Sequence, residues 1–194
     1  MNARQRRFVA MLGLACAAAL WITSTRLVPR PPRTGSIAER ALGPLAPFAA
    51  AVQWTRADLA LRRGEWTRAY ARAESALELD ARNSSGWIYL AHHFVFERAS
   101  LSLEPDPAAR ERWIRAGLDL LERGAARAED AGEVWLYRGA VMAFQASLSD
   151  EDRAWPASAR EAWLAAAEDF ERAAEHGHPD AADAAARARE LADR

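Results

Sequence analysis

After residue 40 the chain consists largely of residues that favour the α-helix, and this limits the folds open to it. Ala, Leu, Arg and Glu dominate, β-branched residues are scarce, and no segment shows sustained alternation of apolar and polar residues. Of the 194 residues, 51% are hydrophobic and 27% are charged, which is typical of a chain with a packed core and not of a disordered one. We therefore expect an all-α fold.

Seven helices are predicted from hydrophobic periodicity and from the residues that cap or stop helices. Ser84 or Ser85 is expected to cap the third helix, Asp106 followed by Pro107 to open the fourth, and a capping box that begins at Ser158 to open the sixth. The expected helices cover approximately residues 47–63, 66–80, 84–102, 106–129, 133–147, 158–177 and 179–192.

The segment 64–91 combines a turn, an amphipathic helix, a second turn and the start of another helix. Its informative residues are Gly64, Glu65 and Trp66 at the first turn, Ala69 and Ala76 on the helix, Asn83 at the second turn, and Trp87, Leu90, Ala91 and Phe94 after it. In these features the segment resembles the tetratricopeptide repeat family, whose 34-residue unit is a pair of antiparallel helices.

The resemblance implies an antiparallel helix-pair solenoid of about three repeats, followed by a capping helix. The first repeat covers residues 50–83, the second opens at Ser84, and the third opens near Gly132. The last helix would cover the final apolar face, as solenoids require. Ala69 and Ala76 are expected at close helix contacts. We assign residues 44–194 to this domain.

The resemblance also implies a binding surface, because the first helix of each repeat lines a concave groove in this family. The groove residues expected on this frame are Trp54, Asp58, Leu61, Arg62, Ile88, His92, Val95, Phe96, Leu136 and Phe144. This largely apolar set suits an amphipathic helix or an apolar peptide of a partner protein. The alternative occupants are the chain's own N-terminal segment and a second copy of the chain.

The sequence predicts no catalytic residues, no metal site and no cofactor. No nucleophile, base and orienting group form a recognisable set, and no glycine-rich phosphate loop is present. His93 and Glu97 share a helix face, but a single pair at this spacing favours a solvated or groove-lining pair over a metal site. We therefore expect a protein that is not an enzyme.

The segment 1–33 differs from the rest of the chain in charge. It contains six arginines and no acidic residue, which leaves 20 arginines against 27 acidic residues, a net charge of −7, in the remainder. Binding of nucleic acid needs a basic face that displaces counterions, so an acidic domain argues against a nucleic-acid partner.

An apolar run from Phe8 to Ile22 follows the first three arginines and predicts a membrane segment. Residues 1–25 are assigned to a signal-anchor that forms a single transmembrane helix, and residues 26–43 to a linker rich in Pro and Arg. A cleaved signal peptide and a lipoprotein with its lipid on Cys16 are the alternatives. The residues expected in the membrane include Phe8, Leu12, Leu14, Leu20, Trp21 and Ile22.

These features together favour an adaptor or scaffold in a bacterial-type cell membrane. The family resemblance implies binding of partner proteins and a role in the assembly or stabilisation of a membrane-associated complex. The alternative is an integral accessory subunit of a large bacterial membrane complex, whose transmembrane helix packs against other subunits. Arg4, Arg6 and Arg7 favour a cytoplasmic N-terminus and a periplasmic or extracytoplasmic repeat domain, whereas three arginines on the other flank favour the opposite orientation.

Overall fold

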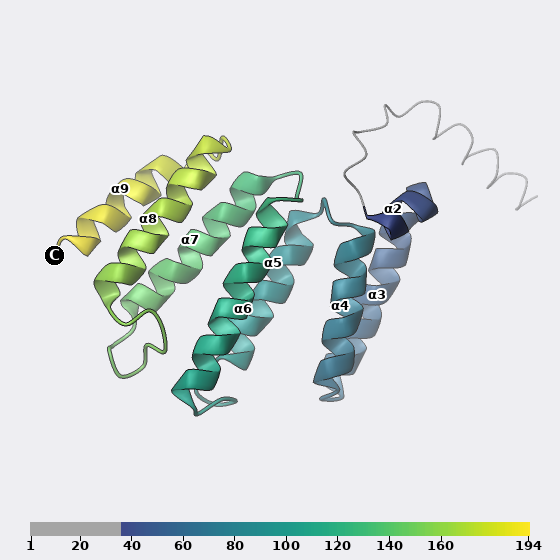
Figure 1. The fold of residues 1–194 in the computed structure, drawn as a ribbon, viewed down its shortest axis with the longest axis horizontal. Helices are drawn as coiled ribbons and strands as arrows, with labels where there is room; N and C mark the ends of the chain where they lie inside the picture. The colour runs from purple at the N-terminus through teal and green to yellow at the C-terminus, as the bar shows by residue number, and fades with distance from the viewer. Residues whose placement is uncertain (1–35) are drawn as a thin grey trace, which may run out of the picture.

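The computed structural model describes residues 36–194, and all regular elements in this range are helical, as the sequence predicts. Figure 1 shows the helices side by side along the long axis of the molecule. They are α2 (Ile37–Leu42), η1 (Gly43–Leu45), α3 (Ala46–Arg62), α4 (Trp66–Leu79), α5 (Ser84–His92), η2 (His93–Arg98), α6 (Pro107–Ala125), α7 (Ala131–Ser147), α8 (Ala159–Glu175) and α9 (Ala181–Ala192).

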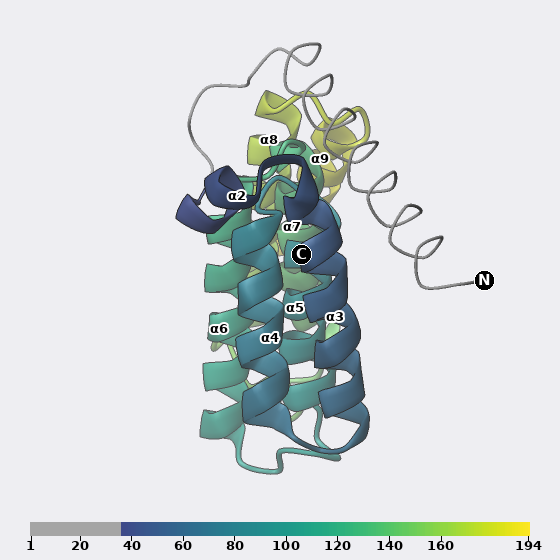
Figure 2. The same cartoon turned by 90° about the vertical axis from the view of Figure 1, so that its right-hand side faces the viewer.

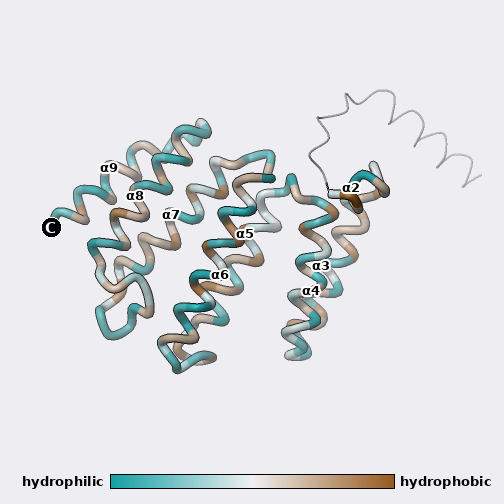
Figure 3. Tube along the Cα trace, viewed as in Figure 1, coloured by the Kyte–Doolittle hydropathy of each residue, from teal (hydrophilic) through white to brown (hydrophobic). Residues whose placement is uncertain are grey.

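The helices pack in successive antiparallel pairs. The pairs are α3 with α4, α5 and η2 with α6, and α7 with α8, and α9 then packs on α8. Figure 2 looks at the N-terminal end of this stack and shows α3 and α5 on one side, with α4 and α6 on the other. Figure 3 shows both hydrophobic and hydrophilic residues on every described helix, as expected of helices that bury one face and expose another.

Small side chains make the contact between the first two helices. The buried residues of α3 are all alanines, and Ala69 and Ala76 on α4 are 1% and 0% exposed. These two residues were expected at close contacts, and the structure confirms both. Because alanine projects only a methyl group, the two backbones approach closely along the length of the pair.

The second pair, α5 with α6, packs around one large buried side chain, Trp87. Trp87 of α5 is 2% exposed, and its indole Nε1 donates a hydrogen bond to the carbonyl oxygen of Ala81 at 2.8 Å. A Cβ atom added to Gly124 of α6 would lie 2.7 Å from Cγ of Trp87. Glycine is therefore the residue that allows α6 to pack against the indole ring.

The third pair contains a buried ion pair. Asp169 of α8 is 1% exposed, and its carboxylate accepts a hydrogen bond from the guanidinium of Arg138 on α7, with Arg172 3.8 Å away. Burial raises the pKa of Asp169, and the two arginines oppose that rise. The ion pair thus offsets the cost of burying a carboxylate between two helices.

Helix α2 lies inside the segment 26–43, which is assigned to a linker on the sequence alone. Ser36 caps it by accepting a hydrogen bond from the backbone N–H of Glu39 at 3.0 Å. The same hydroxyl donates to the backbone carbonyl of Glu78 on α4, so the cap also ties α2 to the first helix pair. A helix this short does not display a helical period, which explains why the pattern did not reveal it.

The third predicted helix differs from the structure at both ends. Its N-cap is Asn83, whose side chain accepts from the backbone N–H of Ser85 at 3.1 Å, and not one of the two serines that follow. It ends at Arg98 in a π-helical segment, where the N–H of Ala99 donates to the carbonyl of Phe94 at 3.0 Å. A π-turn is set by packing and leaves little trace in hydrophobic periodicity.

No helix within residues 36–194 combines the length and the apolar composition that crossing a lipid bilayer requires. The residues expected in the membrane, Phe8, Leu12, Leu14, Leu20, Trp21 and Ile22, lie outside the described residues, as does Cys16.

The substitution Gly124→Ala is expected to destabilise the domain by about 1–3 kcal/mol, because the added methyl group overpacks the buried indole of Trp87. Gly132→Ala is the matched control, since its Cβ would make only ordinary contacts at 3.4 Å and alanine is the better helix former. Thermal unfolding followed by circular dichroism measures both. Equal melting temperatures for the two variants would show that α6 does not pack this closely on α5.

Candidate functional site

An aromatic stripe crosses the first helices of the three pairs. Each aromatic residue in it either contacts the ring of the next one or lies within four residues of it on the same helix. The aromatic stripe consists of Trp54 on α3, Tyr89, His92 and Phe96 on α5 and η2, and Tyr137 and Phe144 on α7.

The part of the stripe between α3 and α5 is fixed by an aromatic pair and a hydrogen bond. The rings of Trp54 and Tyr89 meet edge to face with centroids 5.5 Å apart, and the hydroxyl of Tyr89 donates to Oδ1 of Asp58 at 2.8 Å. Burial and this hydrogen bond raise the pKa of Tyr89 to about 12. The hydroxyl therefore stays protonated, and remains a hydrogen-bond donor to Asp58, to a higher pH than an ordinary tyrosine.

The part between α5 and α7 is a cluster of four rings. Nδ1 of His92 lies 2.6 Å from the hydroxyl of Tyr137, and the ring of Phe96 lies 4.8 Å from that of His92. Phe144 completes the cluster with an edge-to-face contact to Phe96 at 5.0 Å. Burial raises the pKa of Tyr137, so this hydroxyl also stays protonated. The stripe thus joins neighbouring helix pairs and still presents polar atoms at its edges.

Several members of the stripe are open to solvent. Tyr89 is 47% exposed and Phe144 is 43% exposed, and His92 is also exposed, whereas Trp54 and Phe96 are half-buried. Aromatic rings with polar tips are common at protein interfaces, because they bury a large area while the polar tip finds a hydrogen-bond partner. The stripe has this chemical character.

Two hollows flank the aromatic stripe. The first, of about 340 Å³, is lined by Asp58, Leu61, Arg62, Trp66, Tyr89, His93 and Glu97. The second, of about 300 Å³, is lined by Val95, Phe96, Ala99, Ser100, Leu101, Arg110, Ile114, Phe144, Gln145, Leu148, Asp152 and Ala154. Hollows beside exposed rings can accept side chains that project from a bound segment.

The adjacent histidines serve different contacts. His93 is 4% exposed, its Nδ1 lies 2.9 Å from Oε2 of Glu97, and its ring stacks on Trp66 with centroids 5.6 Å apart. His92 faces Tyr137 instead. The two imidazoles do not converge on one point, and within residues 36–194 no group of three or more metal-ligating side chains gathers.

The structure brings most of the expected groove residues to this surface. Asp58, Leu61 and Arg62 line the first hollow, and Phe96 and Phe144 belong both to the stripe and to the second hollow. Trp54 and His92 are members of the stripe. Two of the expected residues, Ile88 and Leu136, are half-buried and pack against the core.

Val95 lies in the core and not on the groove that the family frame predicts. It is 4% exposed, and a Cβ atom on Gly117 would lie 2.6 Å from its Cγ2. The side chain therefore packs between η2 and α6, and it also lines the second hollow. The π-helical turn changes the angular positions in this segment, which a regular frame of 3.6 residues per turn does not reproduce.

Sequence reasoning missed the two tyrosines of the stripe. Tyr89 follows the expected groove residue Ile88 by one position, and Tyr137 follows Leu136 in the same way. One residue is a rotation of about 100° on a helix, so at these two positions the side chain that joins the stripe is displaced by that angle from the expected one. The signal in the sequence is a shared interval, since Tyr89 and Tyr137 are as far apart along the chain as Phe96 and Phe144.

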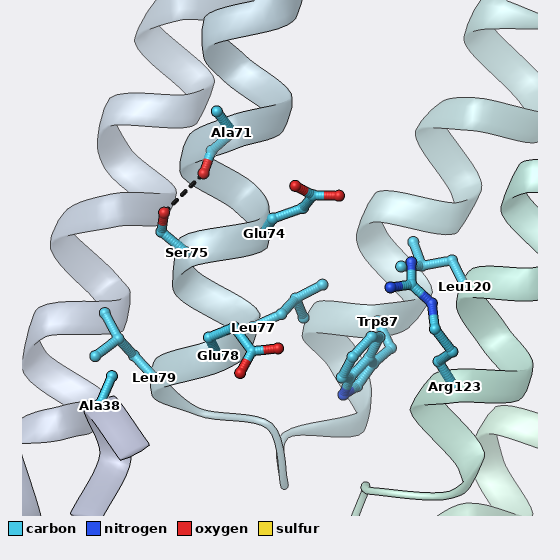
Figure 4. A pocket seen from close by; sticks show the side chains of 10 residues that line it. All are labelled: Ala38, Ala71, Glu74, Ser75, Leu77, Glu78, Leu79, Trp87, Leu120 and Arg123. Atoms are coloured by element: carbon cyan, nitrogen blue, oxygen red, sulfur yellow. Dashed lines mark hydrogen bonds between the residues drawn. The ribbon is translucent and has the colours of Figure 1, made fainter. Parts of the chain in front are cut away.

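A further hollow, of about 540 Å³, lies between α4 and α6. Figure 4 shows Glu74 and Glu78 on α4 facing Leu120 and Arg123 on α6, with Trp87 between the helices. Acidic and basic side chains both line it, and Glu78 also forms an ion pair with Arg127 at 2.8 Å. This hollow lies on the side of the second helices, so it is separate from the aromatic stripe.

Comparison with models of known protein families, with curated proteins and with solved structures finds no match to this chain.

Proposed function

We propose that this protein is a membrane-anchored adaptor with a tetratricopeptide-like helical repeat, which binds partner proteins in the assembly or stabilisation of a membrane-associated complex. The observation that carries the proposal is the aromatic stripe, which is continuous over three helix pairs and partly open to solvent. Exposed aromatic residues that form one contiguous patch are typical of binding surfaces.

The repeat part of the proposal is supported by the order of the helices. Three antiparallel pairs follow one another, and a single final helix covers the last pair. This is the arrangement expected of a short solenoid with a capping helix. Long connections join η2 to α6 and α7 to α8, and repeat proteins accept added residues in such connections.

The chemistry of the stripe favours an amphipathic helix or an apolar peptide as the bound segment. Ring faces of Phe96 and Phe144 offer apolar contact, whereas His92 and Tyr137 offer polar atoms that can orient the segment. The first hollow adds both signs of charge, through Asp58, Glu97 and Arg62. A segment with apolar anchors and a few polar groups matches this surface.

The membrane part of the proposal rests on the sequence from Phe8 to Ile22, which has the apolar character of a signal-anchor. The alternative function, an integral accessory subunit of a large membrane complex, uses the same two features. It differs in predicting that the intact chain is recovered in a stoichiometric, detergent-stable complex, whereas an adaptor exchanges between partners.

Affinity purification of the full chain from gently solubilised membranes tests the binding surface. Phe144→Asp places a charge in the stripe and is expected to reduce the recovery of partners at least about 30-fold, which is typical of a hot-spot residue. Because Phe144 is 43% exposed, the melting temperature should change little. Leu103→Asp is the matched control, since Leu103 is 49% exposed and lines neither hollow.

Partner recovery that falls equally in both variants would mean that the loss is not specific to the stripe. Full recovery with Phe144→Asp, at an unchanged melting temperature, would refute the stripe as the binding surface.

The anchor is tested by the intact mass of the chain extracted from membranes. An uncleaved anchor leaves Met1 or Asn2 as the first residue. A mature N-terminus between Cys16 and Arg26 would contradict the anchor, and a diacylglyceryl mass on Cys16 would establish the lipoprotein alternative.

A further inference from the structure

The N-terminal end of the helical stack exposes large apolar side chains. Phe48 is 74% exposed, Val52 is 49% exposed and Leu59 is 48% exposed, all on α3. Ile37 on α2 and Leu45 on η1 are also exposed, over 79% and 57% of their area. The first three described elements thus expose five large apolar side chains, and exposed apolar side chains that gather on one part of a protein mark interaction sites.

The three residues of α3 lie on one face, opposite the core. At 100° per residue, Phe48, Val52 and Leu59 fall within a sector of about 40°. The buried residues of α3, such as Ala57, lie on the other side of the helix. Helix α3 is therefore apolar on two sides, of which only one is covered by the described residues. In Figure 2 the short helix α2 lies at the upper ends of α3 and α4, and no described helix lies in front of the rest of these two helices.

The C-terminal end of the stack is different. The outer face of α9 exposes Ala182, Asp183, Arg187 and Glu190, and no large apolar side chain. This face is that of an ordinary solvated cap. The contrast between the two ends indicates that the N-terminal end meets a different environment from the C-terminal end.

Arginines lie beside the C-terminal part of this apolar face, next to Leu59. Arg56, Arg63, Arg68 and Arg72 line one hollow of about 330 Å³ together with Leu59. The hollow includes a single carboxylate, Glu65, which is paired with Arg68 at 3.0 Å. The hollow thus keeps an excess of positive charge beside the apolar face.

This positive charge is local. Residues 36–82 carry seven arginines against six acidic residues, a net charge of +1, whereas residues 83–194 carry 13 arginines against 21 acidic residues, a net charge of −8. The domain is therefore strongly polarised from one end to the other. Its basic end is also the end with the exposed apolar residues.

We propose that the end face formed by α2, η1 and α3 docks on the surface of an anionic phospholipid bilayer. Phe48, Val52 and Leu59 enter the boundary between headgroups and acyl chains, while Arg56 and Arg63 contact the lipid phosphates. A helix with a central apolar sector and flanking basic residues has the chemistry of an interfacial membrane helix. The opposite, acidic end then points away from the bilayer.

Charge favours an anionic bilayer over the two other possible occupants of this face, the chain's own N-terminal segment and a second copy of the chain. The segment 1–33 carries six arginines and no acidic residue, so it cannot neutralise the arginine cluster. A second copy docked through the same face would bring two arginine clusters to one interface, which like charges disfavour. An anionic lipid surface is complementary to both the charge and the apolar residues.

The length of the chain before α2 is also compatible with docking on the bilayer. This step rests on the proposed membrane anchor. The connection from Thr23 to Gly35 reaches at most about 45 Å, so an anchor that ends at Ile22 holds the domain beside the bilayer. Helix α2 is the first described element after this connection, and it belongs to the docking face.

The test uses the full chain with Cys16→Ala and a single fluorescent label at Val52→Cys, in vesicles whose lipids carry a nitroxide quencher. In vesicles of phosphatidylcholine and phosphatidylglycerol (3:1) the label should be quenched, and in pure phosphatidylcholine much less. A label at Ala186→Cys, on the outer face of α9, should stay unquenched in both. In the anionic vesicles, the double variant Arg56→Glu and Arg63→Glu should lower the equilibrium constant for docking of the domain on the bilayer at least about 25-fold. Each arginine near an anionic surface raises this equilibrium constant roughly fivefold.

Unquenched label at position 52 in the anionic vesicles would overturn the proposal. Quenching as strong in neutral vesicles, or in anionic vesicles with the charge-reversed variant, would also overturn it. Shielding of the label at position 52 that rises with protein concentration in the absence of anionic lipid would identify a second copy as the occupant, and would overturn it as well. Flotation of the chain with neutral vesicles reports separately on the anchor, so failure of the anchor and failure of the docking face are distinguished.

Discussion

The close approach of helix backbones at alanine and glycine is the contact on which this fold depends. Ala76 is fully buried between α3 and α4, and a Cβ on Gly139 of α7 would lie 2.6 Å from the ring of Phe170 on α8. With such small residues in the contacts, each helix is fixed by its sequence neighbours and the pairs form a stack with two ends. Stability in such a stack is nearly a sum over neighbouring pairs.

This construction decides where the large side chains go. Trp87 and Phe170 fit inside helix pairs because glycines face them. Other rings lie between successive pairs or on the faces of the stack, as Trp54, Phe96 and Phe144 do. The same construction leaves the two end helices half covered. At the C-terminal end the uncovered face of α9 is polar, whereas at the N-terminal end the uncovered face of α3 exposes Phe48. Both proposed interaction surfaces are therefore consequences of how the helices pack.

Much of the fold follows from the sequence, because caps and breakers act locally. Asp106 caps α6 by accepting from the N–H of Ala108 at 3.1 Å, and Ser158 caps α8 in the same way, as predicted. The surface was harder to predict. Its position depends on the rotation of each helix about its own axis, so a frame that is one residue out selects Ile88 instead of Tyr89. Val95, in the π-helical segment, packs against Gly117 of α6, and no local pattern encodes a contact between residues so far apart in the sequence.

Photo-crosslinking in living cells tests the binding role of the stripe most directly. Benzoylphenylalanine in place of Phe144 keeps an aromatic ring in the stripe, and the same group at Ala186 on α9 serves as the control. The proposed function predicts crosslinks at position 144 to one or a few proteins of the membrane fraction, with none of them at position 186. Identical crosslinks at both positions, or none at position 144 in cells that produce the folded chain, would contradict a partner-binding role for this surface.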